Sequence, residues 1–430
     1  MFKTIVNAFK VKEIRNKILI TLGLLLIYRV GCWLPVPGLM LSEFSKAIGS
    51  QDFLSLISSI SGGALSQGAI LALGISPYIS ASIIIQLLTI AIPSLERLSK
   101  QGEEGRKRIS FYTKICALVL AIAQAVAIVI SYKDCLNTHM FGYDTPTWII
   151  GTLVSIILIA GSMFTYWLGD RITELGISNG LSLLIFVGIL SSAGTSIFAT
   201  ISEIFKGTYS NIIQLVVFLI ALVLIFGFIV FMDTAERKIP VQYAKQIKGR
   251  KMYGGQSTYI PIRVNSTGVM PIIFAMSLLT FPQLLMSIFW PNSKAYVWYS
   301  QWLGAGSWVY IVAVGLLILF FAYFWTQVTF NPDDIARNIQ QNGGFIPTVR
   351  AGKPTADYLR RISNRITLFG AVFLAIIAII PSLIFKGIGN GGLVSAFSAT
   401  GLLIVVSVAI EINNALDVQM KARNYRGFLK

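Results

Sequence analysis

The side chains that most often carry out chemistry are sparse in this sequence. His139 is the only histidine, and the three cysteines, Cys32, Cys116 and Cys135, show no metal-ligand or CxxC spacing. There is no HExxH motif, no Ser/His/Asp arrangement, no pair of aspartates within an apolar run and no Walker P-loop. The sequence therefore predicts no enzymatic activity and no metal or other cofactor, and we interpret the cysteines as structural thiols or bystanders.

Ionisable side chains are also rare inside the apolar runs, where an ion-coupled transporter would need them. Apart from charges at the ends of these runs, Arg29 and Glu411 are the only two. They fall at different depths, so we do not expect them to pair. Arg29 is expected to reach outward or to bond to backbone carbonyls. The amides of Gln86 and Gln124 need partners inside the protein, and plain packing is the simplest interpretation of both.

Composition indicates that a membrane surrounds most of these residues. The chain of 430 residues is 55% hydrophobic and only 12% charged, too few charges to cover a soluble surface. A helix needs about 20 mostly apolar residues to cross a bilayer. Such runs predict ten transmembrane helices, near 18–36, 74–92, 112–132, 147–168, 181–199, 211–232, 268–290, 308–329, 367–385 and 396–414. No cleaved signal peptide is expected, because the first run is a full span without a small-residue cleavage site after it.

Charge in alternate loops orients the ten helices. One set, with both termini, carries the whole net charge of +17, while the other set has as many acidic as basic residues. The positive-inside rule places the basic set in the cytosol. A basic face that only sets topology and binds anionic lipid is the simpler alternative. It does not explain two basic loops, 233–267 and 330–366, that are longer than helix connections need.

The segment 53–73 is apolar but interrupted by serines, by Gly62 and Gly63, and by Gly68. Paired glycines weaken a helix, and lipid would leave the freed backbone groups without partners. The pattern fits a short re-entrant helix buried within the protein, or an ordinary amphipathic turn on the outer surface, and periodicity does not separate the two.

Long motifs follow one another in a fixed order along nearly the whole chain. They include YRVG at 28–31, SGGALSQ at 61–67, LGISPYISASIIIQLL at 73–88, GDRITELGISNG at 169–180, ERKIPVQYAK at 236–245, QSTYIPIRVNSTGVMPIIFA at 256–275, NPDDIARNI at 331–339, GGFIPTVRAGKPT at 343–355 and LLIVVSVAIE at 402–411. Together these stretches resemble the SecY family, the channel subunits of the bacterial Sec translocon. The resemblance implies an all-α polytopic protein with ten transmembrane helices in two pseudo-symmetric inverted halves. They would be 1–205, with a plug segment at about 54–70, and 206–430, with the two long loops.

The resemblance also implies a hydrophobic pore ring and a movable plug. The ring would consist of Ile75, Ile79, Leu181, Ile185, Ile273 and Ile404. Within it, the pairs Ile75–Ile79 and Leu181–Ile185 have i, i+4 spacing and so share a helix face. Branched aliphatic side chains seal a resting channel and yield around any passing sequence, because they form no specific bonds. The plug would include Ser58, Ile60, Ser61, Gly62, Gly63, Ala64 and Leu65.

The remaining implied sites concern partners. A lateral gate would open between the second and third spans on one side and the seventh and eighth on the other, with Gln86 and Gln124 as polar contacts. Lys245, Lys248, Arg250, Lys251 and Arg350 would dock the SecA motor ATPase or the ribosome, with Arg360, Arg361 and Arg365 on the same face. For each lysine alone, a solvated charge is the simpler interpretation. Four positions depart from the usual family pattern: Leu181, Asp233, Gln246 and Ala351.

The expected function is therefore a passive, gated conduit for secretory polypeptides, which also admits membrane proteins sideways into lipid. Its partners would be SecE-like and SecG-like small membrane subunits, SecA, the ribosome, signal sequences, nascent polypeptides and membrane lipid. The resemblance places it in the bacterial plasma membrane with both termini cytosolic. A small-solute transporter or a membrane enzyme would need the midplane ionisable residues or inward-facing nucleophiles that the sequence lacks.

Overall fold

The computed structural model describes most of the chain. The described residues are 8–49, 58, 61–99, 101–137, 146–205, 210–243, 246–248, 251–253, 257–265, 268, 270–290, 293–304, 307–388 and 399–427.

Each of the ten expected spans falls on an α-helix. The helices are α2 (Lys12–Gly31), α5 (Ser76–Ala91), α7 (Glu103–Ser131), α8 (Thr147–Leu175), α9 (Gly180–Phe205), α10 (Ser210–Thr234), α11 (Met270–Phe289), α13 (Trp308–Thr329), α15 (Lys353–Ile388) and α17 (Ala399–Gly427). Among the described residues, five helices are long and apolar enough to cross a membrane by length and composition alone. A sixth arises if α5 and α6 (Pro93–Ser99), which meet at 105°, count as one broken span.

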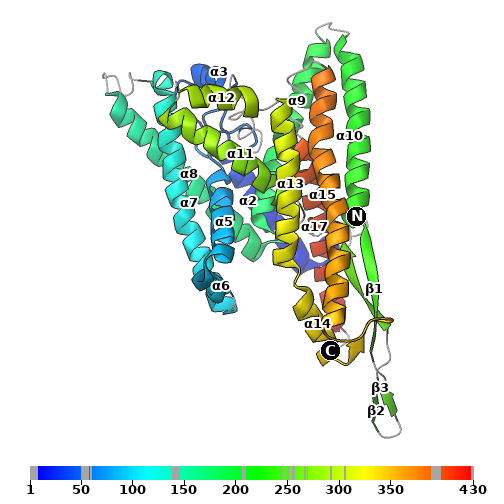
Figure 1. Ribbon diagram of the computed structural model, residues 1–430. Helices are drawn as coiled ribbons and strands as arrows, with labels where there is room; N and C mark the ends of the chain where they lie inside the picture. Colours follow the sequence, from blue (N-terminus) through cyan, green and yellow to red (C-terminus); the bar gives the residue numbers. More distant parts are fainter. Residues whose placement is uncertain are drawn as a thin grey trace.

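The helices form two groups (Figure 1). On one flank α5 packs against α7, and α7 packs against α8; on the other flank α15 contacts α13 and α10. Helix α11 slants between the groups and contacts both α13 and α7, while α17 touches α9, α10 and α15. The chain is thus a mainly helical membrane bundle, in which α11 connects the flanks directly and α17 connects them through α9, which packs against α8.

The two long loops form a small sheet that the sequence analysis did not predict. Strand β1 (Glu236–Tyr243) pairs antiparallel with β4 (Ser257–Arg263) and with β5 (Gly344–Phe345), which comes from the second loop. A hairpin of β2 (Gln246–Lys248) and β3 (Lys251–Tyr253) extends beyond it. The sheet and α14 (Pro332–Gln341) share a hydrophobic core formed by Ile239, Val241, Ile262, Ile339, Ile346 and Leu359.

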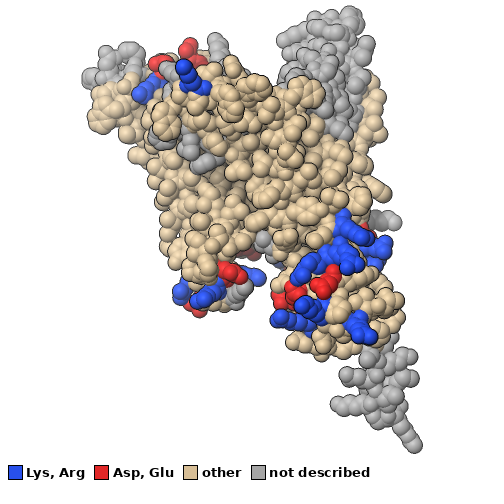
Figure 2. All heavy atoms as spheres, viewed as in Figure 1, with Lys and Arg blue, Asp and Glu red and all other residues tan. Residues whose placement is uncertain are grey.

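Lysine and arginine gather at one end of the molecule (Figure 2). They cover the tip below α5 and the region of the sheet and α14, whereas the apolar middle carries almost none on this face. We call this the basic end. The opposite end holds two shorter helices, α3 (Leu41–Gly49) and α12 (Lys294–Leu303). This separation agrees with the charge asymmetry of the loops.

Candidate functional site

All six expected ring residues lie in one hydrophobic cluster where the two groups of helices meet. Three of them are buried and three are half-buried. They come from four helices, or from the residue that begins one: α5, α9, α11 and α17. We call these six residues the apolar waist: Ile75, Ile79, Leu181, Ile185, Ile273 and Ile404.

Local contacts at the start of α9 position two waist residues. The Asn179 side chain accepts a hydrogen bond from the Leu181 backbone N–H at 3.1 Å, and the Thr173 hydroxyl accepts one from the Gly180 N–H at 2.9 Å. A Cβ at Gly169 would lie only 2.5 Å from the Leu181 side chain. The absence of a side chain at Gly169 therefore lets α8 approach α9 closely enough to pack Leu181 into the waist.

A cavity of about 700 Å³ lies directly beside the waist. Ile185, Ile273 and Ile404 form part of its wall, and polar residues form another part. These polar residues are Ser178, Asn179, Ser182, Asp233, Arg263, Asn265, Ser407, Glu411, Asn414 and Gln419. Since Arg263 ends strand β4 of the basic end, the cavity leads from that end to the apolar waist.

Several cavity residues are already paired across the molecule. Asn265 donates to Asp233 at 2.6 Å, and Ser178 donates to Glu411 of α17 at 3.1 Å. The carbonyl oxygen of the Asn265 side chain and the hydroxyl of Ser407 are buried without a hydrogen-bond partner among the described residues. Both residues line the cavity, but these two atoms are themselves buried behind its surface. Arg29 and Glu411 do not pair with each other; each has a different partner.

The expected plug residues are buried next to the waist. Ser58, Ser61, Ala64 and Leu65 are at least nine-tenths buried, and Ala64 belongs to the same cluster as the waist. Ser58 is helical, and residues 61–75 run mainly as turns that are buried within the protein, so over these residues the chain forms neither the re-entrant helix nor the outer-surface turn that the sequence left open. Ile60 lies outside the described residues.

Backbone conformation and one arginine hold these turns. Gly62 and Gly63 have φ of +72° and +83°, values that favour glycine. The Ser58 carbonyl accepts from the Gly63 N–H at 2.7 Å. Arg29 donates to the Gly62 carbonyl at 2.9 Å, which confirms the expectation that Arg29 bonds to a backbone carbonyl. The charge of Arg29 thus lies against the plug segment.

The two amides expected at a lateral gate lie on neighbouring helices. Gln86 is on α5 and Gln124 on α7, and α7 borders α11. Gln86 donates weakly to Ser82 at 3.4 Å, and its carbonyl oxygen is buried without a partner among the described residues. Ile83 of α5 packs in the same cluster as Ile272 of α11. The seam between α5, α7 and α11 is therefore apolar, with unsatisfied polar capacity from Gln86.

The expected docking residues are only partly described. Lys245 and Arg250 lie outside the described residues, while Lys248 and Lys251 pair in register across the β2–β3 hairpin. Arg350 is exposed, and its carbonyl accepts from the Thr355 hydroxyl at 2.8 Å. Arg361 and Arg365 are exposed as well. Arg360 is also exposed, and it forms ion pairs with Asp333 at 2.8 Å and Asp357 at 3.6 Å.

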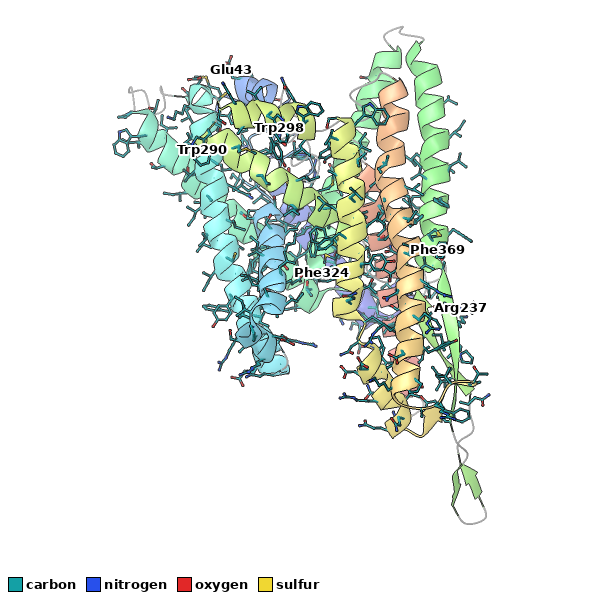
Figure 3. The ribbon with its side chains drawn as sticks, in the orientation of Figure 1. Glu43, Arg237, Trp290, Trp298, Phe324 and Phe369 are labelled. Atoms are coloured by element: carbon teal, nitrogen blue, oxygen red, sulfur yellow. The ribbon has the colours of Figure 1, made fainter. Side chains whose placement is uncertain are left out.

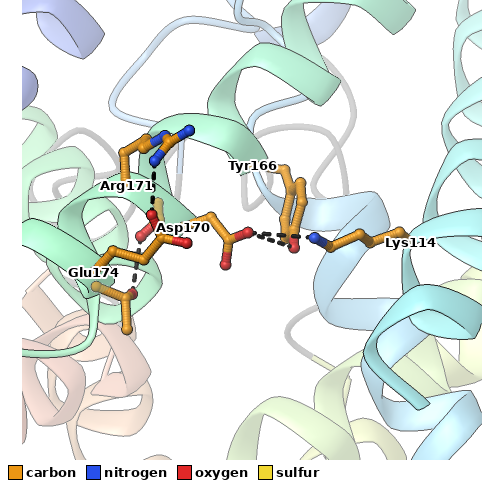
Figure 4. A network of polar contacts seen from close by, with 7 residues as sticks. Lys114, Tyr166, Asp170, Arg171 and Glu174 are labelled. Atoms are coloured by element: carbon orange, nitrogen blue, oxygen red, sulfur yellow. Dashed lines mark hydrogen bonds and ion pairs between the residues drawn. The ribbon is translucent and has the colours of Figure 1, made fainter. Parts of the chain in front are cut away.

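The sequence analysis missed a polar network that joins three helices (Figure 4). The Asp170 carboxylate of α8 lies 3.4 Å from Lys114 Nζ of α7 and accepts from the Tyr166 hydroxyl at 3.2 Å. The Tyr166 ring stacks on Tyr78 of α5, with ring centroids 4.4 Å apart. The sequence signal for this network was that Lys114 and Asp170 lie at the same end of two apolar runs. Their pairing depends on contacts between residues far apart in sequence.

Comparisons with known proteins identify the family of the chain. The sequence model of the SecY family matches residues 69–413. The protein translocase subunit SecY of Streptomyces galbus is 39% identical over 447 residues, which cover 100% of both chains.

Two solved structures share the fold. One concerns the plug domain of the SecY protein, described as stabilising the closed state of the translocation channel and maintaining a membrane seal. It has a TM-score of 0.64 at 20% identity, covering 94% of this chain and 91% of that one. The other is Sec61 in the canine ribosome-channel complex from the endoplasmic reticulum, with a TM-score of 0.62 at 18% identity and the same coverage. The family match over most of the sequence and the full-length relative show that the chain belongs to the SecY family.

Proposed function

We propose that the chain is the central channel subunit of a Sec translocase, a passive gated conduit for unfolded polypeptide. The observation that carries the proposal is the apolar waist beside a polar cavity of about 700 Å³. An extended chain enters the cavity from the basic end. The waist then closes around it without specific bonds, so that many sequences pass while ions are held back.

The walls of the cavity suit a polypeptide in transit. Polar side chains of the wall, such as Ser182 and Asn414, accept from or donate to the backbone of whatever chain passes. Such bonds are few and exchangeable, which permits movement. In our proposal the segment 54–70 is the plug that fills the far side of the waist at rest, and it leaves when a chain arrives.

Lateral opening requires α5 and α7 to part from α11, with the halves 1–205 and 206–430 moving as units. The seam is mainly apolar, as Ile83 and Ile272 illustrate. A signal sequence is itself an apolar helix, so it replaces one wall of the seam at little cost. Gln86 and Gln124 then mark the polar positions that the entering helix meets.

The driving force comes from partners, because the chain has no nucleotide-binding motif of its own. In our proposal the SecA motor or a translating ribosome docks at the basic end, using Arg350 and the hairpin region of Lys245, Lys248, Arg250 and Lys251. SecE-like and SecG-like subunits brace the bundle in the bacterial plasma membrane, and both termini are cytosolic. The chain itself is not an enzyme.

Site-specific crosslinking to a stalled secretory chain tests the conduit. A photoreactive residue at Ile79 or Ile273 should crosslink to the stalled chain. The matched control is Leu316 of α13, which is exposed on the apolar surface and should crosslink to lipid only. Equal crosslinking to the stalled chain from all three positions, or none from the two isoleucines, would overturn the proposal.

A further inference from the structure

Four tryptophans mark one level of the molecule, at the end opposite the basic end. Trp33, Trp148, Trp290 and Trp308 are each more than 60% exposed. Each lies within two residues of the terminus of a helix that was expected to span the membrane: α2, α8, α11 and α13. Tryptophan prefers the boundary between lipid headgroups and hydrocarbon, so these side chains indicate where that boundary crosses the protein.

Helix α12 lies at this end of the molecule (Figure 1), and Trp290 and Trp308 flank it in the sequence. Figure 3 shows Trp290 and Trp298 close to this end, and Trp298 belongs to α12 itself. The Tyr299 hydroxyl donates to the Leu279 carbonyl of α11 at 2.6 Å. Leu279 is one turn before Pro282, which lies inside α11 and removes a backbone donor there. This hydrogen bond fixes α12 to α11 in the region of that proline.

The sides of α12 differ in chemistry. Tyr296, Tyr299, Ser300 and Leu303 are partly buried and form one side that faces the protein. The other residues are exposed, and with 3.6 residues per turn they fall into two adjacent strips. Ala295, Trp298 and Trp302 form an apolar strip, and Lys294, Val297 and Gln301 form a more polar strip. The two exposed tryptophans are i, i+4 neighbours on the same strip.

We propose that α12 is an interfacial anchor that lies in the plane of the lipid surface opposite the basic end. Trp298 and Trp302 enter the boundary between headgroups and acyl chains, while Lys294 and Gln301 face water. Two features favour lipid as the occupant. The apolar strip continues the level marked by Trp290 and Trp308, and the adjacent polar strip suits a helix half in water. Through Tyr299, the anchor holds α11, which borders the seam between the two groups of helices.

Paired labels on adjacent residues test this placement. Gln301→Cys and Trp302→Cys place a small fluorophore on the two strips, in a Cys116→Ala background that retains the buried Cys32 and Cys135. Each variant is reconstituted alone at about one copy per vesicle of phosphatidylethanolamine and phosphatidylglycerol. We expect spin-labelled lipid to quench the label at 302 at least about threefold more than the label at 301, and iodide to show the reverse order.

Two outcomes would overturn the anchor. Equal access of iodide to both positions would mean that α12 stands in water, and protection of position 302 from both quenchers would mean that protein covers the strip. A second measurement avoids any effect of the label on folding. Lipid brominated near the glycerol should quench native tryptophan fluorescence less in a Trp298→Phe, Trp302→Phe variant than in the wild type. Unchanged quenching would count against the proposal.

Discussion

Gly62 and Arg29 show how single residues seat the plug segment. Arg29 donates to the Gly62 carbonyl, and a Cβ built on Gly62 would lie 3.0 Å from Gly188 Cα of α9. Gly188 is three residues beyond Ile185 of the waist. The plug backbone therefore packs against α9, the helix that carries the waist residues Leu181 and Ile185. A charge inside an apolar bundle is tolerated here because a backbone carbonyl satisfies part of it.

A substitution at Gly62 should therefore unseat the plug. Gly62→Ala introduces both a strained left-handed residue, about 1–2 kcal/mol, and close contacts with the Arg29 guanidinium and with Gly188 of α9. Gly63→Ala is the matched control, because Gly63 also has positive φ but its Cβ would meet nothing closer than 3.9 Å. We expect the reconstituted Gly62→Ala channel to show higher resting ion conductance in planar bilayers than the Gly63→Ala channel. Equal conductance in the two variants would show that the contacts of Gly62 with Arg29 and α9 do not seat the plug.

At the scale of elements, the helices were predictable and the sheet was not. Each apolar run of suitable length became a helix, since lipid requires backbone groups to be satisfied within the segment. Strand β1 contains Pro240, and proline weakens the sequence signal of a strand. Its partner β5 belongs to a loop about a hundred residues further along the chain. The alternation of Ile239, Val241 and Tyr243 in β1, and of Ile260 and Ile262 in β4, was a local sign of strands. Pairing between distant segments cannot be read from period alone.

The hydrophobic core shared by the sheet and α14 can be tested by mutation. Leu359 of α15 is fully buried among the residues of the sheet core. Leu359→Ala should destabilise the packing of the two loops by about 2–5 kcal/mol, through lost burial and a residual cavity. Tyr358→Ala is the control, because its side chain is exposed. Limited proteolysis should cut the loops 233–267 and 330–366 faster in the Leu359 variant only. If both variants resist protease like the wild type, the core does not hold the loops together.

Across the whole molecule, the waist depends on two groups of helices meeting at one level. The i, i+4 spacing predicted that Ile75 and Ile79 share one helix face, as do Leu181 and Ile185. It did not predict that the four helices of the waist meet. That expectation came from the family resemblance, and the structure places all six residues in one cluster. The same meeting of helices creates contacts such as Ser178 with Glu411, which connects the start of α9 to α17. Such contacts must change if the halves move apart.

Joining the two halves at this contact should therefore stop transport. Ser178→Cys with Glu411→Cys, bridged by a short cleavable bifunctional maleimide, would hold α17 against the loop before α9 and prevent the waist from widening. We expect translocation of a secretory protein into reconstituted vesicles to fall by about tenfold or more and to recover when the bridge is cleaved. Variants with only Ser178→Cys or only Glu411→Cys, treated with the same reagent, control for the loss of the hydrogen bond, for the added mass and for reaction at the three native cysteines. Full transport with the bridge intact would mean that a passing chain does not require the halves to separate at this point.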